Sequence, residues 1–384
     1  GGAGPPPPPA APPAAPPTVE SVYRTLCECV DAGSAAERAA AEAVLMRWEV
    51  AGLPTALVRV AEGVGAAREE ARLLAVLVLK NGVGSSVRKL VGTREWERVA
   101  GPEQDEVRRA LERMALAEPS ERVAVQLALL VANVARVDYP DRWPHLVRGL
   151  LGAAAWANGQ TPPEQKDRAL RVLKHTLSAV ASRSAFMRQR LLGTGSVGNT
   201  HQAAVQDSFE PLASEWEAHA AAAASGGPDA GARAGLAVRC AQAMRPLFAI
   251  VPSLQPLHVG FDIGRLFQTF LPHLTAAPAA SAVAAKHRRL LAECATLALD
   301  SHPADFAPML GPFVRQLMEA ILALPADALA ADPKWALILT RFLARALLCP
   351  LYDPARVEEE LGGASRAGPP SPPTPGGGGS PERE

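Results

Sequence analysis

One stretch, Ser120 to Leu151, constrains the fold of this chain more than any other. Its first part, Glu121 to Val137, is almost entirely apolar, and its few polar side chains recur three, four or seven positions apart. On a helix of 3.6 residues per turn such positions share one narrow stripe. The stripe consists of Arg122, Gln126, Asn133 and Arg136. A helix buried everywhere except along one stripe lies between similar helices, so the pattern predicts stacked helical pairs.

The segment that follows, Asp138 to Leu146, combines the end of one helix with the start of another. Pro140 cannot continue a helix, because proline lacks an amide hydrogen and its ring clashes with the preceding turn. We expect Asp141 to cap the next helix and Pro144 to occupy its first turn, where the missing amide costs nothing. The segment therefore predicts a tight corner between two helices.

The composition limits the classes of function. The chain has 384 residues, in which 39 lysines and arginines are balanced by 39 aspartates and glutamates. This balance argues against nucleic-acid binding as the principal function. Aromatic residues are few while alanine and leucine are abundant, as in helical proteins. No apolar run approaches the roughly 20 residues that a membrane span requires, so we predict no membrane insertion.

The two ends of the chain differ from the rest in composition. Residues 1–17 are rich in proline, alanine and glycine, and residues 362–384 in glycine, proline and serine. Such compositions cannot form a packed core, so we predict disordered or polyproline-like tails. The first residue is Gly1 rather than methionine, which hints at a fragment.

Between the tails, helical patterns recur as pairs. Apolar residues spaced as on a helix predict pairs such as 19–33 with 35–48, 53–62 with 68–81, and 306–322 with 333–348. The apolar run Leu73 to Leu79 alone would also suit a buried strand. The acidic Glu69 and Glu70 before it and Lys80 after it complement a helix dipole and favour a helix. Roughly seven pairs of about 40–50 residues predict an all-α superhelical solenoid of HEAT repeats.

No motif in the sequence requires an enzyme. The segment Gly193 to Gly198 matches G-x-G-x-x-G, but dinucleotide binding also needs a strand before it, and the preceding residues have a helical pattern. We therefore favour an inter-helix loop. The eight histidines do not cluster, and the pair Cys27 and Cys29 lacks a second pair of ligands. We predict no catalytic residue, cofactor or metal; the five scattered cysteines favour a reducing compartment.

The remaining candidate for function is a polar surface on the second helices of the pairs. The second helices of the pairs carry polar strips, such as Arg68, Arg72 and Lys80 on one helix. Stacked side by side, these strips would line a groove able to hold a folded partner or an extended peptide. An ordinary solvated face is the alternative interpretation.

The residues also carry a family resemblance. Trp48-Glu49, the run Arg72 to Val83, and the motif Ala124-x-x-Leu127-Ala128 through Asp138-x-Pro140-x-x-Trp143-Pro144-x-Leu146 resemble the N-terminal domain of importin-β-type nuclear transport receptors. Within that superfamily the similarity is strongest to the importin-eleven branch. The resemblance implies an N-terminal importin domain over residues 18–150, followed by further HEAT repeats over 151–361.

The resemblance also implies partners and a mechanism. Receptors of this kind bind the small GTPase Ran in its GTP form, carry protein cargo and contact the Phe-Gly repeats of nucleoporins. They shuttle between nucleus and cytoplasm through the nuclear envelope. The implied Ran-binding residues are Lys80, Asn81 and Arg136, to which the polar cluster after Lys80 adds Arg88 and Lys89 as candidates. The residues implied to shape the repeats are Trp48, Pro140, Trp143 and Pro144.

Two other functions stay open from the sequence alone. The first is a HEAT or armadillo scaffold that assembles complexes without transporting them. The second is an enzyme that uses the glycine-rich segment at Gly193. We expect the chain to be monomeric in either the receptor or the scaffold role.

Overall fold

A computed structural model describes residues 17–47, 52–63, 65–81, 96, 99–181, 197–249, 263–275, 281–301, 303–325 and 328–349. Within these ranges every regular element is helical and no strand occurs, which confirms the predicted all-α class. Apart from Pro17, the predicted tails lie outside the described residues, as does Trp48. Among the described helices none is long and apolar enough to cross a membrane.

Fifteen helices follow one another along the described part of the chain. Their bounds are α1 Val19–Asp31, α2 Ala35–Arg47, α3 Leu53–Glu62, α4 Glu69–Asn81, α6 Gly101–Ala117, α7 Glu121–Asp138, α8 Leu146–Ala154, α9 Pro163–Val180, α11 Val197–Ala224, α12 Ala230–Met244, α13 Ile263–Thr275, α14 Ala282–Ser301, α15 Pro303–Leu322, α16 Ala328–Ala331 and α17 Pro333–Leu347. A 3₁₀ turn, η1, covers Leu247–Ala249.

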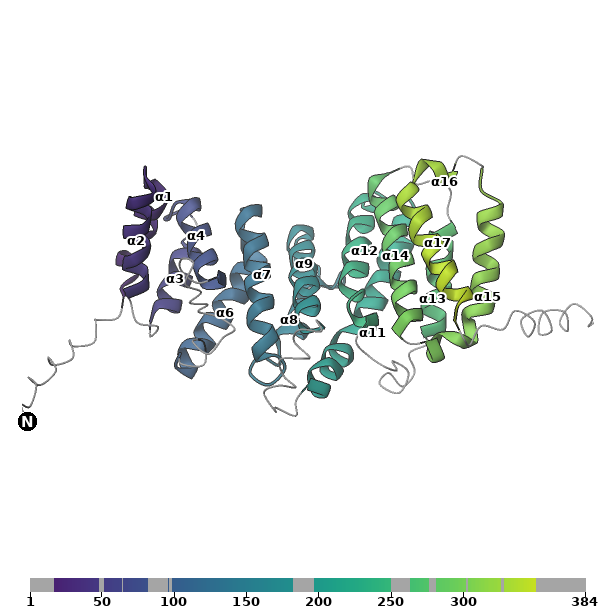
Figure 1. Ribbon diagram of the computed structural model, residues 1–384, viewed down its shortest axis with the longest axis horizontal. Helices are drawn as coiled ribbons and strands as arrows, with labels where there is room; N and C mark the ends of the chain where they lie inside the picture. The colour runs from purple at the N-terminus through teal and green to yellow at the C-terminus, as the bar shows by residue number, and fades with distance from the viewer. Residues whose placement is uncertain are drawn as a thin grey trace, which may run out of the picture.

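The helices pack as pairs that form a row. The pairs are α1 with α2, α3 with α4, α6 with α7, α8 with α9, α11 with α12, α13 with α14, and α15 with α17. Figure 1 shows them in sequence order along the long axis, from the purple N-terminal end to the yellow end. Each pair buries its apolar stripes against the next, so the core runs along the row instead of gathering at one centre.

The second helices of the pairs form a continuous layer. From α4 onward each contacts the next, in the order α4, α7, α9, α12, α14 and α17. The first helices form the other layer, in which α3 contacts α1 and α6, α8 contacts α11, and α13 contacts α15. We call the solvent-facing side of the layer formed by the second helices the second-helix face. It is the surface that the sequence predicted as a candidate groove.

Helix α4 confirms the helical interpretation of the run Leu73 to Leu79. Ala75, Val76 and Leu79 are fully buried, as one face of a helix between neighbours should be. The two glutamates in its first turn and Lys80 in its last turn complement the helix dipole.

Helix α7 is sandwiched as its pattern predicted, between α4 and α9 in its own layer and against α6 in the other. Most of its apolar residues are buried, while its polar stripe retains contact with solvent. Ser120 caps the helix by accepting a hydrogen bond from the amide of Val123. The periodic pattern therefore specified both the helix and its surroundings.

The corner after α7 differs from its prediction. The carbonyl of Asp138 accepts hydrogen bonds from the amides of Arg142 and Trp143, at 2.7 and 3.0 Å, and a cis bond joins Tyr139 to Pro140. The two hydrogen bonds hold the segment in a turn, and α8 begins only at Leu146. Asp141 is therefore not its cap, and Pro144 precedes the helix instead of lying in its first turn. The prediction of both roles was wrong.

Candidate protein-binding surface

Lys80 lies on the second-helix face and bridges two of its helices. Its Nζ atom donates a hydrogen bond to Oε1 of Gln126, a member of the α7 stripe, over 2.5 Å. Nearby, Arg122 Nη1 of the same stripe lies 3.8 Å from Oε1 of Glu69 on α4. Partial burial lowers the pKa of Lys80 below its ordinary value. The structure thus brings the predicted Lys80 together with the α7 stripe.

The other predicted Ran-binding residues are only partly described. Arg136 lies in the last turn of α7 and is half-buried. Asn81 ends α4, but its side chain lies outside the described residues, and so do Arg88 and Lys89 entirely. Their place in a GTPase-binding site therefore stays a prediction.

Arg72 is not part of the polar strip, contrary to the prediction. Its side chain is 5% exposed and forms an ion pair with Glu118, itself 1% exposed. Its Nε atom also donates to the carbonyl of Ala61 on α3, over 2.9 Å. Helical spacing placed Arg72 in the same polar strip as Arg68 and Lys80. Arg72 is buried instead, because its ion-pair partner Glu118 is itself buried. Arg72 holds α4 against α3 and the link before α7.

Trp143, for which the resemblance implied a structural role, lies in the corner between α7 and α8. Its ring is buried and its Nε1 atom donates to Oε1 of Glu112 on α6, over 2.5 Å. The corner is thereby fixed to the first-helix layer. Pro140 and Pro144 lie in the turn on either side of it, while Trp48 falls outside the described residues.

A buried polar cluster that sequence reasoning missed supports the same corner. Asp138 has no solvent exposure, and its Oδ2 atom accepts hydrogen bonds from Trp96 Nε1 at 3.1 Å and Arg108 Nε at 2.8 Å. Gln104 Oε1 accepts a further bond from Arg108. The one sequence signal for this cluster was an aspartate at the end of an apolar helix. Its partners Arg108 and Trp96 lie 30 and 42 positions away, so local spacing could not identify them.

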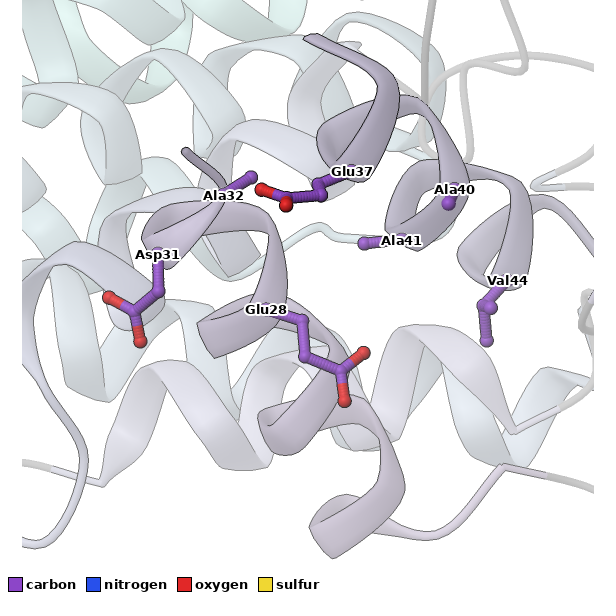
Figure 2. Close-up of a pocket in the computed structure, with 7 residues that line it drawn as sticks. All are labelled: Glu28, Asp31, Ala32, Glu37, Ala40, Ala41 and Val44. Carbon is purple, nitrogen blue, oxygen red and sulfur yellow. The ribbon is translucent and has the colours of Figure 1, made fainter. Parts of the chain in front are cut away.

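A hollow of about 430 Å³ lies between α1 and α2, rimmed by acidic side chains. Figure 2 shows Glu28, Asp31 and Glu37 around a floor that includes Ala40 and Ala41. Two of the three carboxylates are engaged by the chain itself. Asp31 pairs with Arg68 at 2.8 Å, and Glu37 accepts the amides of residues 33 and 34 ahead of α2. The bonds of Glu37 are those of a helix cap.

The cysteines and the glycine-rich segment are the other features that the sequence singled out. Cys27 and Cys29 are free thiols on α1, and burial followed by the charge of Glu42 raises the pKa of Cys29 to about 11. No group of three metal-binding side chains occurs among the described residues. Gly193 to Ser196 lie outside those residues, and Gly198 falls in the first turn of α11.

No family model matches the chain. Over 124 residues, however, it is 31% identical to importin-11 of Mus musculus and of Homo sapiens. The similarity covers 31% of this chain and 11% of each relative.

Solved structures extend the similarity along the chain. The exportin Cse1 in its cargo-free, cytoplasmic state matches 85% of the chain with a TM-score of 0.53 and 18% identity. Lph2, a bidirectional nuclear transport receptor of S. cerevisiae, matches 89% with a TM-score of 0.61 and 14% identity. The chain shares the helical solenoid fold of these two receptors.

This shared fold confirms the predicted HEAT-repeat solenoid, and the resemblance inferred from the sequence is confirmed as a distant similarity to importin-11 over part of the chain. Each match covers 34% of the solved receptor, so the chain spans about a third of their length. The division into 18–150 and 151–361 stays a prediction.

Proposed function

We propose that this chain acts as a nuclear transport receptor that binds Ran-GTP through its first repeats and carries protein cargo between cytoplasm and nucleus. The observation that supports it most is the match of 85–89% of the chain to two nuclear transport receptors. The continuous second-helix layer supplies a surface of the extent that a macromolecular partner requires.

The proposed Ran-binding site lies at the start of the second-helix face. Lys80 and Arg136 present positive charge from α4 and α7, and Asn81, Arg88 and Lys89 belong to the same proposed site. A positive, half-buried site of this kind suits an acidic or polar protein surface. Nucleoporin Phe-Gly repeats would dock between helices of the first-helix layer.

The mechanism follows from linkage between two sites on one solenoid. If Ran-GTP and cargo favour different curvatures of the same row of helices, each lowers the affinity for the other by an equal factor. Ran-GTP in the nucleus would then release imported cargo. Shuttling between nucleus and cytoplasm follows from this cycle.

A pull-down with Ran tests the proposal. The immobilised chain is incubated with Ran loaded with a non-hydrolysable GTP analogue, and in parallel with Ran loaded with GDP. Retention of the GTP form alone supports a receptor. Equal retention of both forms, or of neither, supports the alternative of an assembly scaffold.

The enzyme alternative is tested separately by thermal unfolding with NAD or ATP added. A ligand that binds only the folded state raises the unfolding temperature. An unchanged unfolding temperature would remove the glycine-rich segment at Gly193 as a nucleotide site.

A further inference from the structure

Five basic side chains gather on the second-helix face away from the proposed Ran-binding site. They come from three helices that lie side by side in the layer, α9, α12 and α14 (Figure 1). We call them the basic patch: Arg171, Lys174, Arg239, Arg245 and Lys286. Arg239 and Arg171 are largely covered, whereas Arg245 and Lys286 are exposed.

Lys174 lies on α9, one helical turn after Arg171. Burial lowers its pKa, and the positive charges of Arg239, Lys286, Arg171 and Arg245 lower it further, in that order. All four are therefore close enough for Lys174 to experience their fields, although they lie on three different helices. The charges converge on one place.

The carboxylates nearby neutralise only part of this charge. Asp167 pairs with Arg239 at 2.7 Å and with Arg171 at 3.2 Å, and Glu293 pairs with Arg245 at 2.9 Å. Glu121 adds a contact to Arg171. In the described part of the chain, neither Lys174 nor Lys286 has an ion pair with a carboxylate. Five cations thus face three anions, and the two lysines carry the excess charge.

The surroundings of the patch favour a carboxylate-bearing partner over a nucleic acid. Helices α9, α12 and α14 contain no phenylalanine, tryptophan or tyrosine on which a base could stack. Asp167 and Glu293 stand among the cations and would repel a continuous phosphate backbone. An acidic peptide, whose charges are separated by neutral side chains, can place its carboxylates at the lysines and avoid these anions.

We propose that the basic patch binds an acidic segment, rich in aspartate and glutamate, of a protein partner. The inference rests on the proposed receptor function, in which cargo occupies the second-helix face, and it names the chemistry of the segment that this part of the face accepts. A lysine-rich or arginine-rich segment is excluded here by repulsion from five cations.

Fluorescence anisotropy tests the proposal on the full chain at low ionic strength. The probes are a labelled peptide of alternating glutamate and serine, a peptide of alternating lysine and serine with equal length, and a single-stranded RNA of similar length. We expect only the glutamate peptide to bind, and its affinity to fall as salt is raised, because the contacts are between exposed charges.

The deciding variant reverses the two uncompensated charges, Lys174→Glu with Lys286→Glu. Two reversed surface charges should raise the dissociation constant of the glutamate peptide about tenfold. A second variant, Lys174→Gln with Lys286→Gln, removes the charges without adding new repulsion and should have a smaller effect in the same direction. Lys334→Glu is the matched control, since Lys334 is an exposed lysine of α17 on which the patch does not depend.

Three outcomes would overturn the inference: no binding of the glutamate peptide, unchanged binding by both double variants, or tighter binding of RNA than of the peptide. A helical circular dichroism spectrum equal to that of the wild type shows that each variant is folded. A GTP-dependent interaction with Ran that persists when the peptide does not bind would leave the proposed function standing while this inference fails.

Discussion

Arg108 of α6 and Asp138 of α7 form an ion pair at 2.7 Å that is almost completely enclosed, with side-chain exposures of 6% and 0%. Trp96 donates a second hydrogen bond to the same carboxylate oxygen. The pair joins the two helices of one repeat at the point where the chain turns into the next. A buried charge is stable only while its partner is present.

Removal of one member of this pair should therefore be costly. We expect Asp138→Ala to lower the free energy of unfolding by about 3–5 kcal/mol, because the buried Arg108 loses its enclosed counter-charge and keeps only the exposed carboxylate of Asp105. Denaturant unfolding followed by circular dichroism measures the loss. The double variant Asp138→Leu with Arg108→Met should recover much of it; equal losses in the two variants would contradict the explanation.

Trp143→Ala should also destabilise the chain, for a different reason. The substitution empties a large buried site and removes the hydrogen bond to Glu112, so we expect a loss of about 3–5 kcal/mol. Trp143→Phe keeps most of the ring and should cost about 1 kcal/mol for the lost hydrogen bond. A Phe variant as unstable as the Ala variant would show that packing is not the main contribution.

Charge reversal at the proposed GTPase site should weaken Ran-GTP binding while the chain stays folded. The change is Lys80→Glu with Arg88→Glu, and titration of labelled Ran-GTP measures the affinity. Arg109→Glu is the matched control, since it makes the same kind of change at an exposed arginine of α6 in the first-helix layer. Unchanged affinity in the double variant, with an intact helical spectrum, would remove Lys80 and Arg88 from the site.

Acid should destabilise the fold through buried histidines, of which His287 is an example. Burial and the neighbouring His273 lower the pKa of His287 from 6.5 to about 4, and its Nε2 atom accepts a hydrogen bond from Trp216 at 2.8 Å. Between pH 6.5 and about 4, His287 is neutral in the folded state, whereas the same side chain binds a proton in the unfolded chain. Stability should therefore fall as pH falls from 6.5 to 4, by at most about 1.4 kcal/mol per pH unit for each such histidine.

The matched variant for this effect is His287→Gln, whose side-chain oxygen can still accept the tryptophan hydrogen bond but does not titrate. Unfolding free energies measured at several pH values should show a shallower slope for the variant than for the wild type. Parallel slopes would assign the pH dependence to other groups.

The sequence by itself determined the helical class, the pairing of helices and the burial of α7. These three features depend on the spacing of apolar residues within each helix. That spacing is a local property, so it can be recognised without knowing which other helices pack against it. The sequence also identified Lys80 as a polar residue of a second helix, whereas the role of Trp143 in shaping the corner, which the resemblance implied, stays a prediction. All residues of the predicted GTPase site stay predictions, and the side chains of Asn81, Arg88 and Lys89 lie outside the described residues.

Only the tertiary structure decided which polar side chains face solvent. Arg72 and Lys80 occupy the same helix, yet Glu118 buries the first and Gln126 holds the second at the surface. The start of α8 was set by hydrogen bonds to the carbonyl of Asp138, and the basic patch joins residues as far apart as Asp167 and Arg239. The periodicity of apolar residues predicts which face of a helix is polar. Which side chains pack against that face depends on how repeats that are distant in the sequence stack on one another.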